Sequence, residues 1–310
     1  MEVADFGEFP KDSVMPKSNN DDDTQNLPGF EDTSMPSFET EFVLHHQDCI
    51  AGMREHVADD SVDLVVTSPP YNLGIAYGTY KDNKTSEDYL EWTREWAAEV
   101  KRVLKPEGSL FLNIGAAPSN PWMPHEVALQ LRDLLFLQNT IHWIKSISVH
   151  EKSTPDEPIS VGHFKPINSK RFVNDCHEFV FHFTKSGKVP VDRIAAGVPY
   201  ADKSNIKRWA HTGGRDKRCR GNAWYIPYDT ITSRKGERPH PATFPIKLAT
   251  QCLILHGADP SETTMLEPFL GIGHAAMAAG KHDVAKFIGF EIDDDYMAEA
   301  VKRTGGGQGA

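Results

Sequence analysis

The sequence predicts an α/β fold in which a doubly wound core is interrupted by an insertion, and two observations support this. Short apolar runs with the length of buried strands alternate with helical patterns in both outer parts of the 310-residue chain. Between them, from about residue 147 to 239, prolines, glycines and basic residues become frequent and the alternation stops. We therefore expect the two outer parts to build one core around an inserted segment.

The elements before the insertion follow from apolar spacing and from proline. A strand at 42–44 precedes a short helix, and the Val- and Leu-rich run 62–66 predicts a buried strand. Two consecutive prolines end this strand, because proline cannot donate to a ladder. An N-cap signal at Ser86 and apolar residues at helical spacing predict a helix over 86–104. The other expected elements of this part are a turn at 105–108, a strand at 109–114, a helix at 129–137 and a strand at 140–146.

Regular structure is expected to resume near Pro245, after an insertion that itself holds a strand at 178–183. Helical spacing and strand-length apolar runs alternate again from there to the C-terminus. The expected elements are a helix at 246–255, a strand at 264–269, a helix at 274–279, a strand at 286–291 and a helix at 296–303.

Composition narrows the class of protein. The four cysteines are far apart and form no CxxC pair, which indicates reduced thiols in an intracellular protein. No segment approaches the run of about 20 apolar residues that a membrane span needs, and the N-terminus lacks the pattern of a signal peptide. Adjacent His45 and His46 would point to opposite faces of a strand, so we expect no metal site.

The distribution of charge matters more than the net charge of −11. Residues 1–40 hold ten acids and two bases without an apolar period, which predicts an acidic, disordered tail. Residues 145–240 hold eighteen bases and ten acids. A net positive charge is expected of a segment that binds phosphates. A basic face exposed to solvent is the simpler alternative.

The most informative segment is Ser68-Pro69-Pro70-Tyr71, directly after the strand at 62–66. It predicts a rigid loop at the carboxyl end of a sheet strand, where open α/β folds bind their ligands. A serine hydroxyl, fixed backbone carbonyls and an aromatic face can hold a flat ring and accept hydrogen bonds from its amino group. A plain proline turn would explain this loop in isolation.

A second constellation, Glu267-Pro268-Phe269-Leu270-Gly271-Ile272-Gly273, lies between an expected strand and an expected helix. Its glycines let a ligand approach the backbone at a helix N-terminus. Glu291 ends the next strand, about 20 residues after Gly273, where an acid is placed to bind ribose hydroxyls. These features predict a nucleoside-binding half-fold, with tight helix–strand packing as the alternative role of the glycines.

Together the motifs resemble those of the permuted beta class of DNA amino-methyltransferases. Residues 68–71 resemble the catalytic motif, and 267–273 resemble the S-adenosyl-L-methionine (SAM) motif, with Glu where Asp is usual. The segment 240–245 resembles the His-Pro-x-x-x-Pro segment that closes the methionine pocket, and 47–49 resembles a Gly-Asp-Cys turn. The resemblance covers about residues 42–303. It implies a Rossmann-like SAM-dependent methyltransferase sheet, circularly permuted, with an inserted target-recognition region.

The resemblance also implies the cofactor and its contacts. The cofactor would be SAM, bound by Asp48, Thr67, Thr243, Glu267, Phe269, Gly271, Gly273 and Glu291. The expected organisation is a tail at 1–40, a catalytic half of the core at 41–146, a target-recognition region at 147–239 and a SAM-binding half at 240–310.

The serine at position 68 favours cytosine over adenine as the expected target base. In this family Ser-Pro-Pro-Tyr goes mostly with cytosine, and Asp- or Asn-Pro-Pro-Tyr mostly with adenine. The catalytic residues would be Ser68, Pro69, Pro70 and Tyr71, and the product N4-methylcytosine in a flipped-out base. Ser68 and the Pro69 carbonyl would accept the amino hydrogens, Tyr71 would stack on the base, and the proton would leave to solvent. Adenine N6, an RNA or protein amide, and a regulator without catalysis are the alternatives.

The basic middle segment is expected to contact DNA phosphates or guanine edges. The candidates are Lys170, Arg171, Arg215, Lys217, Arg218 and Arg220, each of which could instead be a solvated surface base. The expected partners are double-stranded DNA, a second copy of the chain in a homodimer and a cognate restriction endonuclease, with no membrane. The expected location is the cytoplasm or the nucleoid.

Overall fold

A computed structural model of the chain describes residues 39–305, except 76, 119, 152–153, 163–169, 174, 209–212 and 228–242. The acidic tail expected at 1–40 thus lies, up to residue 38, outside the described residues. Nine strands of the described part form one sheet in the order β1-β9-β8-β2-β3-β6-β4-β5, with β7 paired to β4. They are β1 (Glu41–His46), β2 (Val62–Thr67), β3 (Leu104–Ile114), β4 (Phe136–Glu151), β5 (Thr154–Gly162), β6 (His177–Thr184), β7 (Ala223–Pro227), β8 (Thr264–Glu267) and β9 (Lys286–Glu291).

The strand order interleaves the two outer parts of the chain. β8 and β9, from the C-terminal part, lie between β1 and β2, and the run from β1 to β3 is parallel throughout. β6 is antiparallel to both β3 and β4. This confirms the α/β core built from both outer parts; its circular permutation stays a prediction.

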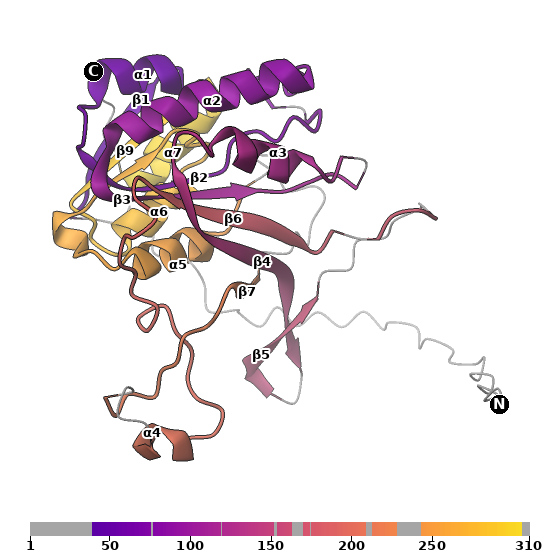
Figure 1. The fold of residues 1–310 in the computed structure, drawn as a ribbon, viewed down its shortest axis with the longest axis vertical. Coiled ribbons are helices and arrows are strands. Elements are labelled where there is room, and N and C mark those ends of the chain that lie inside the picture. Colours follow the sequence, from indigo (N-terminus) through magenta and orange to yellow (C-terminus); the bar gives the residue numbers. More distant parts are fainter. Residues whose placement is uncertain are drawn as a thin grey trace, which may run out of the picture. The chain divides into compact units, whose positions relative to one another are not determined.

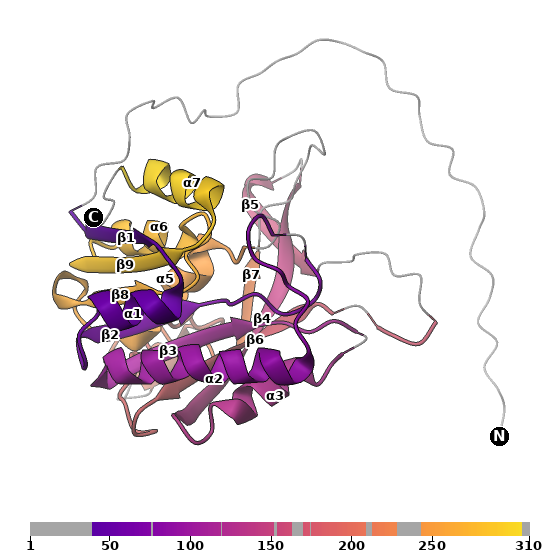
Figure 2. The same ribbon diagram turned by 90° about the horizontal axis from the view of Figure 1, so that it is seen from above.

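Helices cover both faces of the sheet, as a doubly wound fold requires (Figure 1, Figure 2). Leu64 and Val66 of β2 belong to one apolar core, with residues of α5, α6 and α7. Val65, which points to the opposite face, belongs to a second core with residues of α1, α2 and α3. The helices are α1 (Cys49–His56), α2 (Ser86–Val103), α3 (Met123–Gln130), α4 (Ser204–Arg208), α5 (Ile246–His256), the 3-10 turn η2 (Pro260–Glu262), α6 (His274–Gly280) and α7 (Asp294–Thr304).

Three local expectations are wrong. The turn expected at 105–108 belongs to β3, where the register slips from Val62↔Leu104 to Leu64↔Ser109. The helix expected at 129–137 ends at Gln130, and β4 begins at Phe136. The hydroxyl of Thr85, and not of Ser86, caps α2 by accepting from the Asp88 amide.

The middle segment contributes to the sheet as well as to loops. β4 pairs with β7 over residues 142–146 and continues past its pairing with β6 to pair with β5 (Figure 1). β6, predicted as a strand at 178–183, is hydrogen-bonded between β3 and β4. Within the described ranges, no helix combines the length and apolar character needed to cross a membrane.

Candidate active site

The carboxyl ends of the five parallel strands bring the predicted motifs to one edge of the sheet. Asp48 follows β1, and Glu291 and Glu267 are the last residues of β9 and β8. Ser68 follows β2, and Asn113 is near the end of β3. Because neighbouring strands in this run are parallel, all five residues lie at the same edge.

The Ser-Pro-Pro-Tyr loop is fixed by hydrogen bonds on both of its sides. The side chain of Tyr89 in α2 is fully buried, and its hydroxyl donates to the Pro70 carbonyl at 2.8 Å. Thr67, just before the loop, is fully buried and donates to Glu267 Oε1 at 2.5 Å. The loop is thereby anchored to helix α2 and to the end of β8.

A polar network surrounds the loop's two side chains. Ser68 Oγ lies 2.8 Å from Tyr71 Oη, which donates to Glu178 Oε2 at 2.9 Å. The amide nitrogen of Asn113 donates to Tyr71 Oη at 2.7 Å and to Glu178 Oε2 at 2.8 Å. Lys145 of β4 forms an ion pair with Glu178 Oε1. Burial, reinforced by the Glu178 charge, raises the pKa of Tyr71 well above its ordinary value, so the phenol keeps its proton.

The glycine-rich loop carries a buried acid. Glu267 is 1% exposed, and its Oε1 accepts from Thr67 and from the Phe269 amide. Burial raises the pKa of Glu267 well above its ordinary value. Its Oε2 is buried and has no hydrogen-bond partner among the described residues. A buried polar atom without a partner is costly, which is a reason to expect a ligand at this point.

Glu291 organises the backbone opposite this loop. Its Oε2 accepts from the Gly271 amide at 2.7 Å, and its Oε1 accepts from the Ile292 and Asp293 amides at 2.9 Å each. Burial raises the pKa of Glu291, and the three backbone N–H groups oppose that shift. Gly271, at φ +52°, adopts a left-handed conformation that side chains disfavour.

The other predicted cofactor residues lie around the same edge. Asp48 is exposed and caps α1 by accepting from the Ile50 and Ala51 amides. Thr243 is exposed beside Phe244, whose carbonyl accepts from His274 at the start of α6. The predicted segment His240–Ala242 lies outside the described residues.

Phe269 packs against helix α2. Its ring centroid lies 5.4 Å from that of Trp92 and 5.6 Å from that of Trp96. This aromatic packing fixes a side chain that lies two residues after the end of β8.

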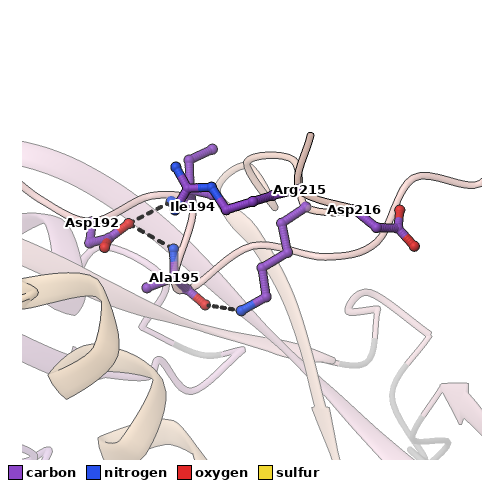
Figure 3. A pocket seen from close by; sticks show the side chains of 6 residues that line it. Asp192, Ile194, Ala195, Arg215 and Asp216 are labelled. Atoms are coloured by element: carbon purple, nitrogen blue, oxygen red, sulfur yellow. Dashed lines mark hydrogen bonds between the residues drawn. The ribbon is translucent and has the colours of Figure 1, made fainter. Parts of the chain in front are cut away.

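Four of the predicted DNA contacts share one loop. Arg215 and Lys217 line a cavity of about 490 Å³ together with Asp192 and Asp216 (Figure 3). The Lys217 ammonium donates to the Ala195 carbonyl at 3.2 Å. The other candidates are Arg218, Lys170 and Arg171, which are exposed, and Arg220, which is half-buried and donates to the Ala196 carbonyl.

Sequence reasoning missed Asn113, Lys145 and Glu178. Glu178 is near the start of a strand that was predicted, and Asn113 is near the end of another. Their contact depends on the antiparallel register Ile114↔Phe179, which no local pattern encodes. A polar residue at the end of an otherwise apolar strand was the available signal.

Comparisons with known proteins show which proteins the chain is similar to. A family model described as DNA methylase matches residues 62–302. The DNA adenine methyltransferase YhdJ of Escherichia coli K12 is 27% identical over 265 residues, which cover 83% of this chain and 81% of YhdJ.

Two solved structures share the fold. The PvuII DNA methyltransferase (cytosine-N4-specific) superposes with a TM-score of 0.60 at 18% identity, over 86% of this chain and 90% of its own. TTHA0409 of Thermus thermophilus, complexed with SAM, superposes with a TM-score of 0.54 at 23% identity, over 85% of this chain and 93% of its own.

Proposed function

Because the chain belongs to the DNA methylase family of N6 and N4 amino-methyltransferases, we propose that it transfers a methyl group from SAM to the N4 amino group of cytosine at a specific DNA site. The observation that carries the proposal is the Ser68 hydroxyl, which is hydrogen-bonded to Tyr71. It directly follows Thr67, which is bonded to Glu267 next to the glycine-rich loop. The Ser-Pro-Pro-Tyr loop would thus connect the binding site of the target base to the binding site of SAM.

When bound, SAM supplies a methyl group on a positively charged sulfur. Residues at the carboxyl ends of the parallel strands would bind the rest of the molecule. The Glu291 carboxylate at the tip of β9 suits ribose hydroxyls, and its oxygens have lone pairs beyond those used by the backbone. Gly271 leaves room for close approach, and Glu267 Oε2 offers a buried polar atom that lacks a partner among the described residues. Asp48, Thr67, Thr243, Phe269 and Gly273 complete the proposed cofactor contacts.

The catalytic loop acts mainly by orientation. An exocyclic amine conjugated to its ring is a poor nucleophile, because its lone pair is delocalised. Acceptance of its two N–H bonds by Ser68 Oγ and the Pro69 carbonyl would direct the lone pair at the methyl group. Tyr71 would stack on the base. The amino group cannot reach this edge from inside a duplex, so the base must flip out.

Cytosine is favoured by Ser68, and adenine is the alternative. The family's Ser-Pro-Pro-Tyr motif goes mostly with cytosine, and the fold is shared with a cytosine-N4 enzyme. A relative of 27% identity is an adenine methyltransferase. Mass spectrometry of nucleosides from methylated DNA separates the two: N4-methylcytosine is expected, and N6-methyladenine would establish the alternative.

Target recognition is assigned to the basic residues of the middle segment. Arg215 and Lys217 lie on an exposed loop, and Lys170 and Arg171 are exposed before β6. Exposed bases there can neutralise phosphates.

The site assignment is tested by transfer of labelled methyl groups from SAM to duplex DNA. Ser68→Ala and Tyr71→Ala are each expected to lower the rate by about 100-fold, because each removes a group that orients the reacting amine. Ser61→Ala removes a hydroxyl at the opposite end of β2 and serves as the matched control. Near-full activity of both loop variants would refute the assignment.

A further inference from the structure

Glu178 ends a hydrogen-bond chain that the proposed reaction does not yet use. It lies beside the end of β3, because Ile114 pairs with Phe179. Its side chain is 12% exposed, and both carboxylate oxygens face donors. Oε1 pairs with Lys145, while Oε2 accepts from Tyr71 Oη at 2.9 Å and from Asn113 at 2.8 Å.

The contacts fix the direction of each hydrogen bond in the chain. Tyr71 donates its only hydroxyl proton to Glu178, so its oxygen can only accept from other groups. The Ser68 hydroxyl proton therefore points at Tyr71 Oη across 2.8 Å. Ser68 Oγ accepts a long contact from the Asn113 amide at 3.3 Å, which leaves one lone pair to accept an N–H of the target amino group.

On the basis of the proposed function, we propose that Ser68, Tyr71 and Glu178 form a relay that removes the proton released by methyl transfer. The amino nitrogen forms its bond to the methyl carbon, and the C–S bond breaks with its electron pair remaining on sulfur. The nitrogen then gives a proton to Ser68 Oγ, the Ser68 proton passes to Tyr71 Oη, and the Tyr71 proton passes to Glu178 Oε2. The carboxylate ends protonated and later releases the proton to water.

The relay provides a base for the proton that the reacting amine releases. A serine hydroxyl alone is a poor base, but it can accept a proton while it passes on its own, so no alkoxide forms. Tyr71 likewise stays a phenol throughout. Asn113 and Lys145 are positioning residues, because they hold the Glu178 carboxylate at the end of the chain. The titratable groups that face Glu178 include Lys145, Tyr71, Tyr77 and His177.

The test compares Glu178→Gln and Tyr71→Phe with the wild type in single-turnover methylation of duplex DNA. Each variant keeps the size of its side chain but breaks the relay. Each rate is expected to fall by about 100-fold near neutral pH and then to rise with pH, since hydroxide must take the proton. Affinities for SAM and DNA, measured by titration, should stay within about threefold of wild type. The double variant should be no slower than either single variant, because one missing link already breaks the chain.

Glu107→Gln, at the exposed opposite end of β3, is the matched control and should keep the wild-type rate. The relay is refuted if the rate of Glu178→Gln stays within about threefold of wild type, if the two single losses multiply in the double variant, or if the loss is the same at every pH. If Glu178→Gln fails to bind SAM because it misfolds, the rate and pH profile of Tyr71→Phe decide alone. A wild-type protein that methylates no DNA would refute the proposed function instead.

Discussion

At the level of single residues, Glu291 has two tasks at the tip of β9. It accepts three backbone N–H groups, including that of Gly271, and so holds the glycine-rich loop against the strand end. It is also the acid proposed to hold the ribose of SAM. Burial raises its pKa, while the backbone donors favour the carboxylate. The Glu291 carboxylate can therefore hydrogen-bond both the glycine-rich loop and the ribose of SAM.

Glu291→Ala is therefore expected to weaken SAM binding by about tenfold or more, since hydrogen bonds to charged groups contribute about 1.5–3 kcal/mol. Isothermal titration calorimetry below the unfolding temperature measures the effect. Glu262→Ala, at an exposed position in η2, should bind SAM like the wild type. Unchanged affinity in Glu291→Ala would count against the ribose contact.

At the level of elements, the loop between β2 and α2 is held by two buried carboxylates. Asp82, 3% exposed, accepts from the backbone amides of Asn72, Leu73 and Ile75 at 2.8, 3.0 and 3.1 Å. On the other side, the Thr79 amide and hydroxyl both donate to Asp293, the N-cap of α7. The loop that begins with the catalytic motif is thus tied to the helix that follows β9.

Asp82→Ala is expected to destabilise the fold by about 2–4 kcal/mol, because it leaves three partly buried backbone donors without their acceptor. Urea denaturation measures this loss. Limited proteolysis should also show faster cleavage within residues 72–85. The exposed Lys81→Ala in the same loop is the control and should unfold like the wild type. Equal stability of the Asp82 and Lys81 variants would contradict this role.

At the level of the whole molecule, a buried polar cluster joins three elements that are distant in sequence. Ser109 of β3 hydrogen-bonds both His182 of β6, at 3.0 Å, and His256 of α5, at 3.1 Å. All three side chains are buried. Burial lowers the pKa of His182 to about 4, and burial also lowers the pKa of His256.

The sign of the pH effect follows from these lowered values. The folded protein keeps His182 neutral, whereas the unfolded chain takes up a proton below its ordinary pKa of about 6.5. Stability is therefore lost as the pH falls from about 6.5 towards 4, by about 2 kcal/mol between pH 7 and pH 5 from His182 alone. Denaturant unfolding at the two pH values measures it. His182→Gln should lose less stability over this interval, and an equal loss would contradict the assignment.

Local patterns predicted those elements whose residues carry a clear signal by themselves. The continuous apolar runs gave β2 and β9 nearly to the residue. Apolar content could not decide the structure around Leu134 and Leu135, which lie in a turn and a bend between α3 and β4. The four expected domain segments, the homodimer and the restriction endonuclease stay predictions.

The sequence by itself determined the two motifs of the site, because each motif consists of residues that are neighbours in the chain. The prolines make one loop rigid, and the glycines let a ligand approach the backbone of the other. Only the tertiary structure decided what surrounds them. The Thr67–Glu267 bond and the contact of Asn113 with Glu178 join residues 200 and 65 positions apart. Such contacts depend on strand order and register, which arise from the packing of the whole sheet between two layers of helices and not from any local run of residues.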